Sequence, residues 1–147
     1  MTEAELQQQV ADYLRLQYPD VLFHSDFGSG TKLTIGQAIR QKRLNGGKRA
    51  WPDMFIAEPK TVKIGETKWE DIDQDYHGLF IELKKEGVRL VKVRKPDEWA
   101  SDHIAEQAET LRALRGRGYM AEFAVGFDEA KKIIDNYLGG CNHEITK

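Results

Sequence analysis

The segment Gly78–Lys84 (GLFIELK) constrains the fold most, because a short apolar run of this kind predicts a buried β-strand. The run nevertheless ends in an acid and a base, Glu82 and Lys84. Side chains alternate across a strand, so these two emerge on one face while Leu83 points the other way into the core. Most such pairs are solvated ion pairs that contribute little. Alone, the segment predicts a buried strand and no particular function.

A second segment, Trp51–Ile56 (WPDMFI), changes that reading. Pro52 fixes the entry angle of a short run of apolar, strand-favouring residues that follows it. Asp53 stands where this run begins, although Asp is a poor strand former. The segment therefore predicts another strand with an acid at its end.

Asp53, Glu82 and Lys84 suit one kind of chemistry if the fold brings them together. Two neighbouring carboxylates repel and raise each other's pKa unless a cation lies between them. Mg2+ prefers a few hard oxygen ligands and keeps sites for water and phosphate. A nearby lysine can orient the attacking water or offset charge that grows on the phosphorus centre. These residue types therefore indicate phosphodiester hydrolysis.

The same residues carry a family resemblance. Pro52-Asp53 followed by Glu82-Leu83-Lys84 resembles the PD-(D/E)xK nuclease signature. The wider pattern is similar to the virus-type replication-repair nuclease (VRR-NUC) branch, and this similarity extends over about residues 5–138. The parts of the pattern are Gly46–Asp53 (GGKRAWPD), the Glu-x-Lys strand, and Gln107 followed by Leu111, Leu114 and Gly118. One departure is the 28 residues between Asp53 and Glu82, which imply an inserted excursion in place of a tight hairpin.

The resemblance implies a restriction-endonuclease-like α/β core with a central mixed β-sheet flanked by helices. We expect strands near 21–27, 53–57, 78–84 and 119–125, with the catalytic groups at one edge of the sheet. The implied activity is DNA hydrolysis dependent on Mg2+ or Mn2+. Asp53, Glu82 and the backbone carbonyl of Leu83 would hold the metal, and Lys84 would prepare the water.

Two further residues, Glu5 and Gln107, have competing interpretations. Thr2-x-x-Glu5 is a capping box at the start of a helix, which accounts for Glu5 completely. The resemblance instead places an acid of the first helix near the metal, so Glu5 is also a possible ligand. Gln107 lies in a helix expected from about Ser101 to Arg115, where a surface polar residue is the default. In the resembled family a glutamine at this place assists the active site.

Charge is unevenly distributed along the chain, although the net charge is only −2. Basic residues gather in 40–49 and 84–95, on either side of the two motifs, as a surface that follows a phosphate backbone would require. Such runs are more often solvated faces, so they only support the proposal. The candidate DNA-binding residues are Lys42, Arg43, Lys48, Arg49, Lys85 and Arg89.

Two segments beside the motifs have predicted shapes. Residues 58–77 form the excursion, which is expected to be a solvated acidic hairpin. Its Asp71-x-Asp73-x-Asp75 pattern mimics a calcium loop, but Tyr76 occupies the sixth position, where glycine is needed, so we reject that interpretation. Residues 88–93 alternate apolar and basic side chains and predict an exposed hairpin arm.

Composition predicts one domain, residues 1–140, followed by a loose C-terminal tail, 141–147. The 40% hydrophobic and 31% charged fractions are ordinary for a soluble protein. A single cysteine, Cys141, indicates a reducing compartment. We find no signal peptide and no apolar run long enough to span a membrane. The expectation is a soluble intracellular protein, in the cytoplasm of a bacterial host if phage-encoded.

The resemblance implies a phage-type, structure-specific endonuclease of replication, recombination or repair, acting as a homodimer on branched DNA such as Holliday junctions. Two symmetric nicks require two sites related by a two-fold axis. Two alternatives remain open: a restriction-type endonuclease on the same core, and a nucleic-acid-binding domain that does not cut. Chelation by EDTA would stop cleavage but leave simple binding intact.

Overall fold

The computed structural model describes residues 1–26, 32–47, 51–66 and 71–139. The predicted contacts of Lys48 and Arg49 and the predicted tail 141–147 therefore lie outside the described residues. The elements in chain order are α1 (Glu3–Gln17), β1 (Phe23–Ser25), α2 (Ile35–Leu44), β2 (Met54–Ile56), β3 (Lys60–Glu66), β4 (Asp71–Tyr76), β5 (Leu79–Lys84), α3 (Asp102–Arg115), β6 (Met120–Val125), α4 (Phe127–Ile134) and a π-helical turn η1 (Asp135–Gly139).

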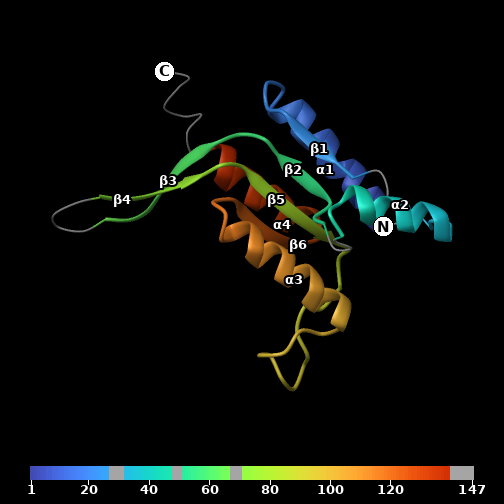
Figure 1. Cartoon of the computed structure of the whole chain (residues 1–147). Helices are drawn as coiled ribbons and strands as arrows, with labels where there is room; N and C mark the ends of the chain where they lie inside the picture. Colours follow the sequence, from blue (N-terminus) through green and yellow to red (C-terminus); the bar gives the residue numbers. More distant parts are fainter. Residues whose placement is uncertain (27–31, 48–50, 67–70, 140–147) are drawn as a thin grey trace.

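The main sheet has four strands in the order β1-β2-β5-β6 (Figure 1). β1 and β2 run antiparallel, as do β2 and β5, whereas β5 and β6 run parallel. The predicted α/β fold with a mixed sheet is therefore confirmed. β2 and β5, which bring the acids together, are the two inner strands, so the acids lie at one end of the sheet and not on an edge strand. The carboxylates are held where these two inner strands end.

Helices cover both faces of this sheet. Leu79, Ile81 and Leu83 of β5 pack into the larger core cluster with α1 and α4. Phe80 of β5, on the alternate face, packs with Leu111 of α3 in a second, smaller cluster. β5 is thus enclosed from both sides, which explains why its sequence reads as a nearly continuous apolar run.

A close approach between β2 and β5 depends on Gly78, immediately before β5. A Cβ atom at this position would lie 2.7 Å from the Phe55 ring and 2.8 Å from the Ile56 carbonyl oxygen. Phe55 also stacks on Phe80 across the two strands, with ring centroids 4.4 Å apart. These contacts fix the register of the two strands that carry the acids.

The excursion between the motifs is a hairpin, as predicted. β3 and β4 pair antiparallel in a sheet of their own, which projects from the main sheet (Figure 1). The insertion therefore lengthens the connection from β2 to β5 without changing how these strands pair.

The expected arm at 88–93 forms only in part. A single β-bridge joins Val91 and Trp99, and the Lys92 amide donates to the Glu98 carbonyl at 3.0 Å. No regular strand forms there, and Val93 is exposed. The segment 85–101 is instead a loop below the tip of β5 (Figure 1).

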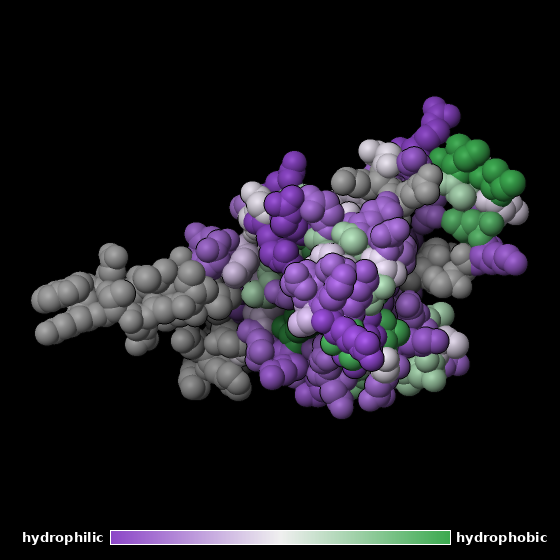
Figure 2. Space-filling model, turned by 90° about the horizontal axis from the view of Figure 1, so that it is seen from below, coloured by the Kyte–Doolittle hydropathy of each residue, from purple (hydrophilic) through white to green (hydrophobic). Residues whose placement is uncertain are grey.

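Helix α2 stands beside the tip of β5 and buries none of its residues (Figure 1). Its N-terminal end is stabilised locally, because Thr34 and Gln37 form a capping box. Ile35, Ile39 and Leu44 are exposed. Figure 2 shows hydrophobic side chains gathered at the side of the molecule where α2 projects, whereas most of the remaining coloured surface is hydrophilic. Within the described ranges, every helix is too short or too polar to cross a membrane.

Candidate active site

Asp53 and Glu82 become neighbours through the pairing of β2 with β5. Met54 is registered with Ile81, so one further step along the antiparallel pair places Asp53 opposite Glu82 on the same face. β2 begins at Met54, directly after Asp53, and the Leu83 amide donates to Oδ2 of Asp53 at 2.8 Å. A strand register therefore brings together two acids that are far apart in sequence.

Burial makes this pair costly. Asp53 is 8% exposed, Glu82 4% and Lys84 6%. Burial raises the pKa of Glu82 well above its usual range, and the charge of Asp53 raises it further. The charge of Lys84 lowers this pKa, but not enough to reverse the shift. The charge of Lys84 therefore does not offset the burial and mutual repulsion of the two carboxylates, and a further positive charge between them would stabilise their ionised forms.

Gln107 of α3 holds one oxygen of Glu82. Its side-chain Nε2 donates to Oε1 of Glu82 at 2.7 Å, and Gln107 itself is 6% exposed. Ser101 caps α3, its hydroxyl oxygen accepting from the Ile104 amide, so the helix begins where Gln107 can reach β5. The default interpretation of Gln107 as a surface residue was wrong; the structure places it beside the acids, as the resemblance implies.

Two buried oxygens at this place have no hydrogen-bond partner in the structure, namely Oε2 of Glu82 and Oε1 of Gln107. Buried acceptors without a donor cost free energy, so they call for a cation, a donor from a ligand, or a proton. Lys84 lies on the same face as Glu82 by strand alternation. The Gly126 amide donates to the Lys84 carbonyl at 2.8 Å and fixes the end of β5.

The backbone of Leu83 supplies a further oxygen. Main-chain groups alternate between the two sides of a strand, and the Lys84 carbonyl faces β6. The Leu83 amide faces the opposite side, toward Asp53, and its carbonyl faces that side too. Within the described ranges, no three Asp, Glu, His or Cys side chains form a metal-binding group. The carboxylates of Asp53 and Glu82 and the Leu83 carbonyl are nevertheless hard oxygen donors of the kind that Mg2+ takes when water and phosphate complete its shell.

Helix α1 carries two acids near its start, Glu3 and Glu5. Glu5 is exposed and closes the capping box: its Oε2 accepts from the Thr2 amide at 2.9 Å. Glu3 is partly buried, and its charge contributes to the raised pKa of Glu82. Sequence reasoning missed Glu3, although the buried stripe of α1, Leu6, Val10 and Leu14, passes through position 3 when it is extended back by one turn. The structure thus makes Glu5 a cap and brings Glu3 toward the carboxylates.

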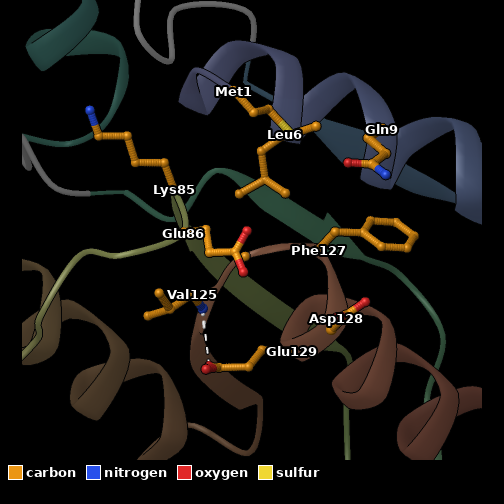
Figure 3. Close-up of a pocket in the computed structure, with 10 residues that line it drawn as sticks. Met1, Leu6, Gln9, Lys85, Glu86, Val125, Phe127, Asp128 and Glu129 are labelled. Carbon is orange, nitrogen blue, oxygen red and sulfur yellow. Dashed lines mark hydrogen bonds between the residues drawn. The ribbon is translucent and has the colours of Figure 1, made fainter.

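The described candidate DNA-binding residues are all exposed. Lys42 and Arg43 lie in the last turn of α2, and Lys85 and Arg89 lie in the loop after β5. Lys85 also lines a hollow of about 420 Å3 between α1 and α4, but Figure 3 shows its amine directed away from the other lining residues. That hollow contains three acids, Glu86, Asp128 and Glu129, which disfavour phosphate.

Comparisons with known proteins agree with this architecture. No protein-family model and no curated protein matches the sequence. A solved structure described as "VRR_NUC domain protein" matches the fold with a TM-score of 0.58 and 24% sequence identity. The match covers 95% of this chain and 89% of that chain. The chain therefore has the fold of a VRR_NUC domain protein, as the motifs predicted.

Proposed function

We propose that this protein is a metal-dependent DNA endonuclease of the VRR-NUC type. The observation that carries the proposal is the pairing of Asp53 with Glu82, two buried acids that face each other beside Lys84. A protein that only needed stability would gain nothing from this arrangement, because burying like charges is costly. The structural likeness to a VRR_NUC domain protein supports the same conclusion.

Each residue has a role that follows from its place. Asp53, Glu82 and the Leu83 carbonyl would hold Mg2+ or Mn2+, and the bound ion would supply positive charge to the scissile phosphate as negative charge develops there. The Lys84 ammonium group would orient the attacking water and add to that stabilisation. Gln107 acts through Glu82, whose carboxylate it keeps in one orientation.

The exposed basic residues would hold the DNA backbone on both sides of the acids. Lys42 and Arg43 lie on α2, and Arg89 lies on the loop below β5. Phosphate contacts of this type position the strand without reading its sequence. A structure-specific enzyme needs no more than this, which favours branched DNA over the alternative of a restriction-type enzyme.

A homodimer is part of the proposal, because two nicks across a junction require two sites related by a two-fold axis. The exposed apolar residues of α2, Ile35, Ile39 and Leu44, support a contact of that kind. Light scattering coupled to size-exclusion chromatography tests it. A monomeric mass at micromolar concentration would contradict the dimer.

The direct test is a gel assay of the purified chain on labelled four-way junction, flap, single-stranded and linear duplex DNA. The expected result is cleavage of branched DNA with Mg2+ or Mn2+ and none with EDTA. A Lys84→Ala variant should lower the rate by about 100-fold or more, as the loss of a positioned charge does. Tight DNA binding without cleavage in either metal would instead favour the remaining alternative, a domain that binds nucleic acid and does not cut.

A further inference from the structure

Two partly exposed tryptophans lie on the same face of the sheet as the carboxylates. Trp51 is 38% exposed and Trp99 is 41% exposed. Their partners in the sheet are Phe80 and Phe123, and both phenylalanines belong to the core cluster on the α3 face. Neither tryptophan belongs to the buried core, and the hydrolytic mechanism gives neither a role.

Trp51 is anchored at two points. Its ring lies 6.0 Å from that of Phe80, which precedes Glu82 by two residues on the same face of β5. Its indole Nε1 donates to the Asn45 carbonyl at 2.9 Å, at the C-terminal end of α2. The ring is therefore fixed between the basic helix and the sheet, two residues before Asp53, while part of its surface stays open to solvent.

Trp99 is anchored on the other side of β5. Its ring lies 5.8 Å from that of Phe123, and Phe123 is the registered partner of Glu82 in the parallel pair of β5 and β6. The β-bridge between Trp99 and Val91 holds its backbone within the loop 85–101. The Trp51 ring thus contacts β5 itself, two residues before Glu82, whereas the Trp99 ring contacts β6 at the residue registered with Glu82. The tip of β5 lies between α2 and this loop (Figure 1).

We propose that Trp51 and Trp99 are stacking platforms for unpaired nucleobases on either side of the scissile phosphate. Aromatic side chains stack with any base, because every base has a π-face, so this contact needs no sequence preference. Rings held in place in the free protein lose little entropy on binding, which favours the stacked state. The proposal rests on the proposed function and adds the substrate feature that would be recognised.

Stacking of this kind selects DNA structure. Bases inside a linear duplex already stack on their neighbours and cannot reach a side chain without being extruded. Bases at a flap, a single-stranded end or an open junction are available at little cost. The tryptophans would therefore favour DNA with unpaired bases, while the basic residues attract all DNA alike through its phosphates.

The test measures binding in EDTA, so that no cleavage occurs, by fluorescence anisotropy of labelled DNA at one salt concentration. The ligands are a blunt duplex, the same duplex with a single-stranded flap, and that duplex with a flap of abasic sites, which keeps the charge and removes the bases. Wild-type protein should bind the flap about tenfold more tightly than the abasic flap. Equal affinity for the two flaps would overturn the proposal without any variant.

Variants then assign the effect to each ring. Trp51→Ala and Trp99→Ala should each weaken flap binding and leave blunt-duplex binding within about twofold, whereas the Phe variants should restore most of the difference. Leu16→Ala, at an exposed apolar position in the last turn of α1, serves as the control and should change neither. Equal losses on both ligands would show that the rings act only through the fold.

Indole fluorescence provides a second readout in a Trp69→Phe background, which leaves Trp51 and Trp99 as the only tryptophans. The normal flap should quench this emission more strongly than the abasic flap. The result is independent of catalysis. If the wild type cleaves DNA but binds the normal and abasic flaps equally, the stacking proposal is wrong and the nuclease proposal stands. If it binds the normal flap more tightly but does not cleave with any metal, the nuclease proposal is wrong and stacking on bases stands.

Discussion

Gln107 donates its side-chain amide to Glu82 at 2.7 Å, so α3 fixes the orientation of an acid that belongs to β5. The two residues meet only because α3 packs over the face of the sheet that Glu82 occupies. Glu82 carries two carboxylate oxygens, and this bond satisfies one of them while the other remains available. The relationship makes Gln107 a positioning residue with measurable consequences.

We expect Gln107→Ala to lower kcat by about 10-fold to 100-fold, a typical cost of removing a group that orients a metal ligand. The KM for DNA should change little, because Gln107 is buried away from the proposed DNA-contacting side chains. The concentration of Mn2+ required for half-maximal activity should rise. Glu106→Gln, at the exposed position beside it, is the matched control, and an equal loss in that variant would contradict the assignment.

Glu82→Gln should abolish cleavage and also stabilise the protein in EDTA. The glutamine keeps the shape of the protonated acid but removes a buried group whose ionisation burial and Asp53 both oppose. With a gain of about 1 kcal/mol, Tm should rise by about 2 to 4 °C in a chain of this size. Thermal melting measures this. A lower Tm with unchanged cleavage would show that Glu82 is only a structural residue.

Metal binding should be visible without DNA. With Mn2+ at about ten times its dissociation constant, the native state gains about 1.4 kcal/mol, so the Tm of the wild type should rise by about 4 °C. Asp53→Asn and Glu82→Gln each remove one carboxylate from the proposed ligand set and should lose most of that shift. An equal shift in all three proteins would place the metal elsewhere.

The sequence predicted the strands and the two acids better than it predicted their surroundings. Alternation along 78–84 was enough to place Glu82 and Lys84 on one face, since strand periodicity is a local property. That the carboxylates lie at the ends of inner strands depends on the order of β2, β5 and β6, which no local pattern contains. The burial of Gln107 likewise depends on how α3 crosses the sheet.

Helix α1 carries two sequence signals that point to different acids. The capping box made Glu5 conspicuous and satisfied it locally, so no role near the metal was needed for that residue. The apolar stripe of the helix instead extends to Glu3, whose charge adds to the rise in the pKa of Glu82 after burial and Asp53. Periodicity therefore carried information that motif matching did not.

This difference can be tested with a matched pair of substitutions. Glu5→Gln should leave cleavage near the wild-type rate and cost about 1 kcal/mol of stability or less, because a glutamine at this position can still close the capping box. Glu3→Gln should change cleavage, since it removes a negative charge that acts on Glu82, and should hardly change Tm. Cleavage rates and melting curves for both variants show which of the two acids affects the active site. A larger loss of activity in Glu5→Gln would reverse the assignment.

Asp135 anchors the C-terminal helical region to α1. Its Oδ1 accepts hydrogen bonds from the hydroxyls of Tyr13 at 2.6 Å and Tyr18 at 2.7 Å, and its Oδ2 accepts from Lys131 at 2.9 Å. Burial raises the pKa of Asp135, but the hydrogen bonds from these three groups outweigh it, so the pKa lies below its ordinary value. The charged form of Asp135 therefore stabilises the folded state.

The sign of the pH dependence follows from that lowered pKa. The contribution of Asp135 is fully present above its unfolded-state pKa, near pH 4, and is lost as the pH falls through the lower folded-state pKa. We expect Asp135→Asn to cost about 2 kcal/mol of unfolding free energy at pH 7, given its charged hydrogen bonds. The gap between the two proteins should narrow below pH 4. Urea titrations from pH 7 to pH 2.5, with the exposed Asp97→Asn as control, measure this gap, and a gap that stays constant over that range would contradict the role of the charge.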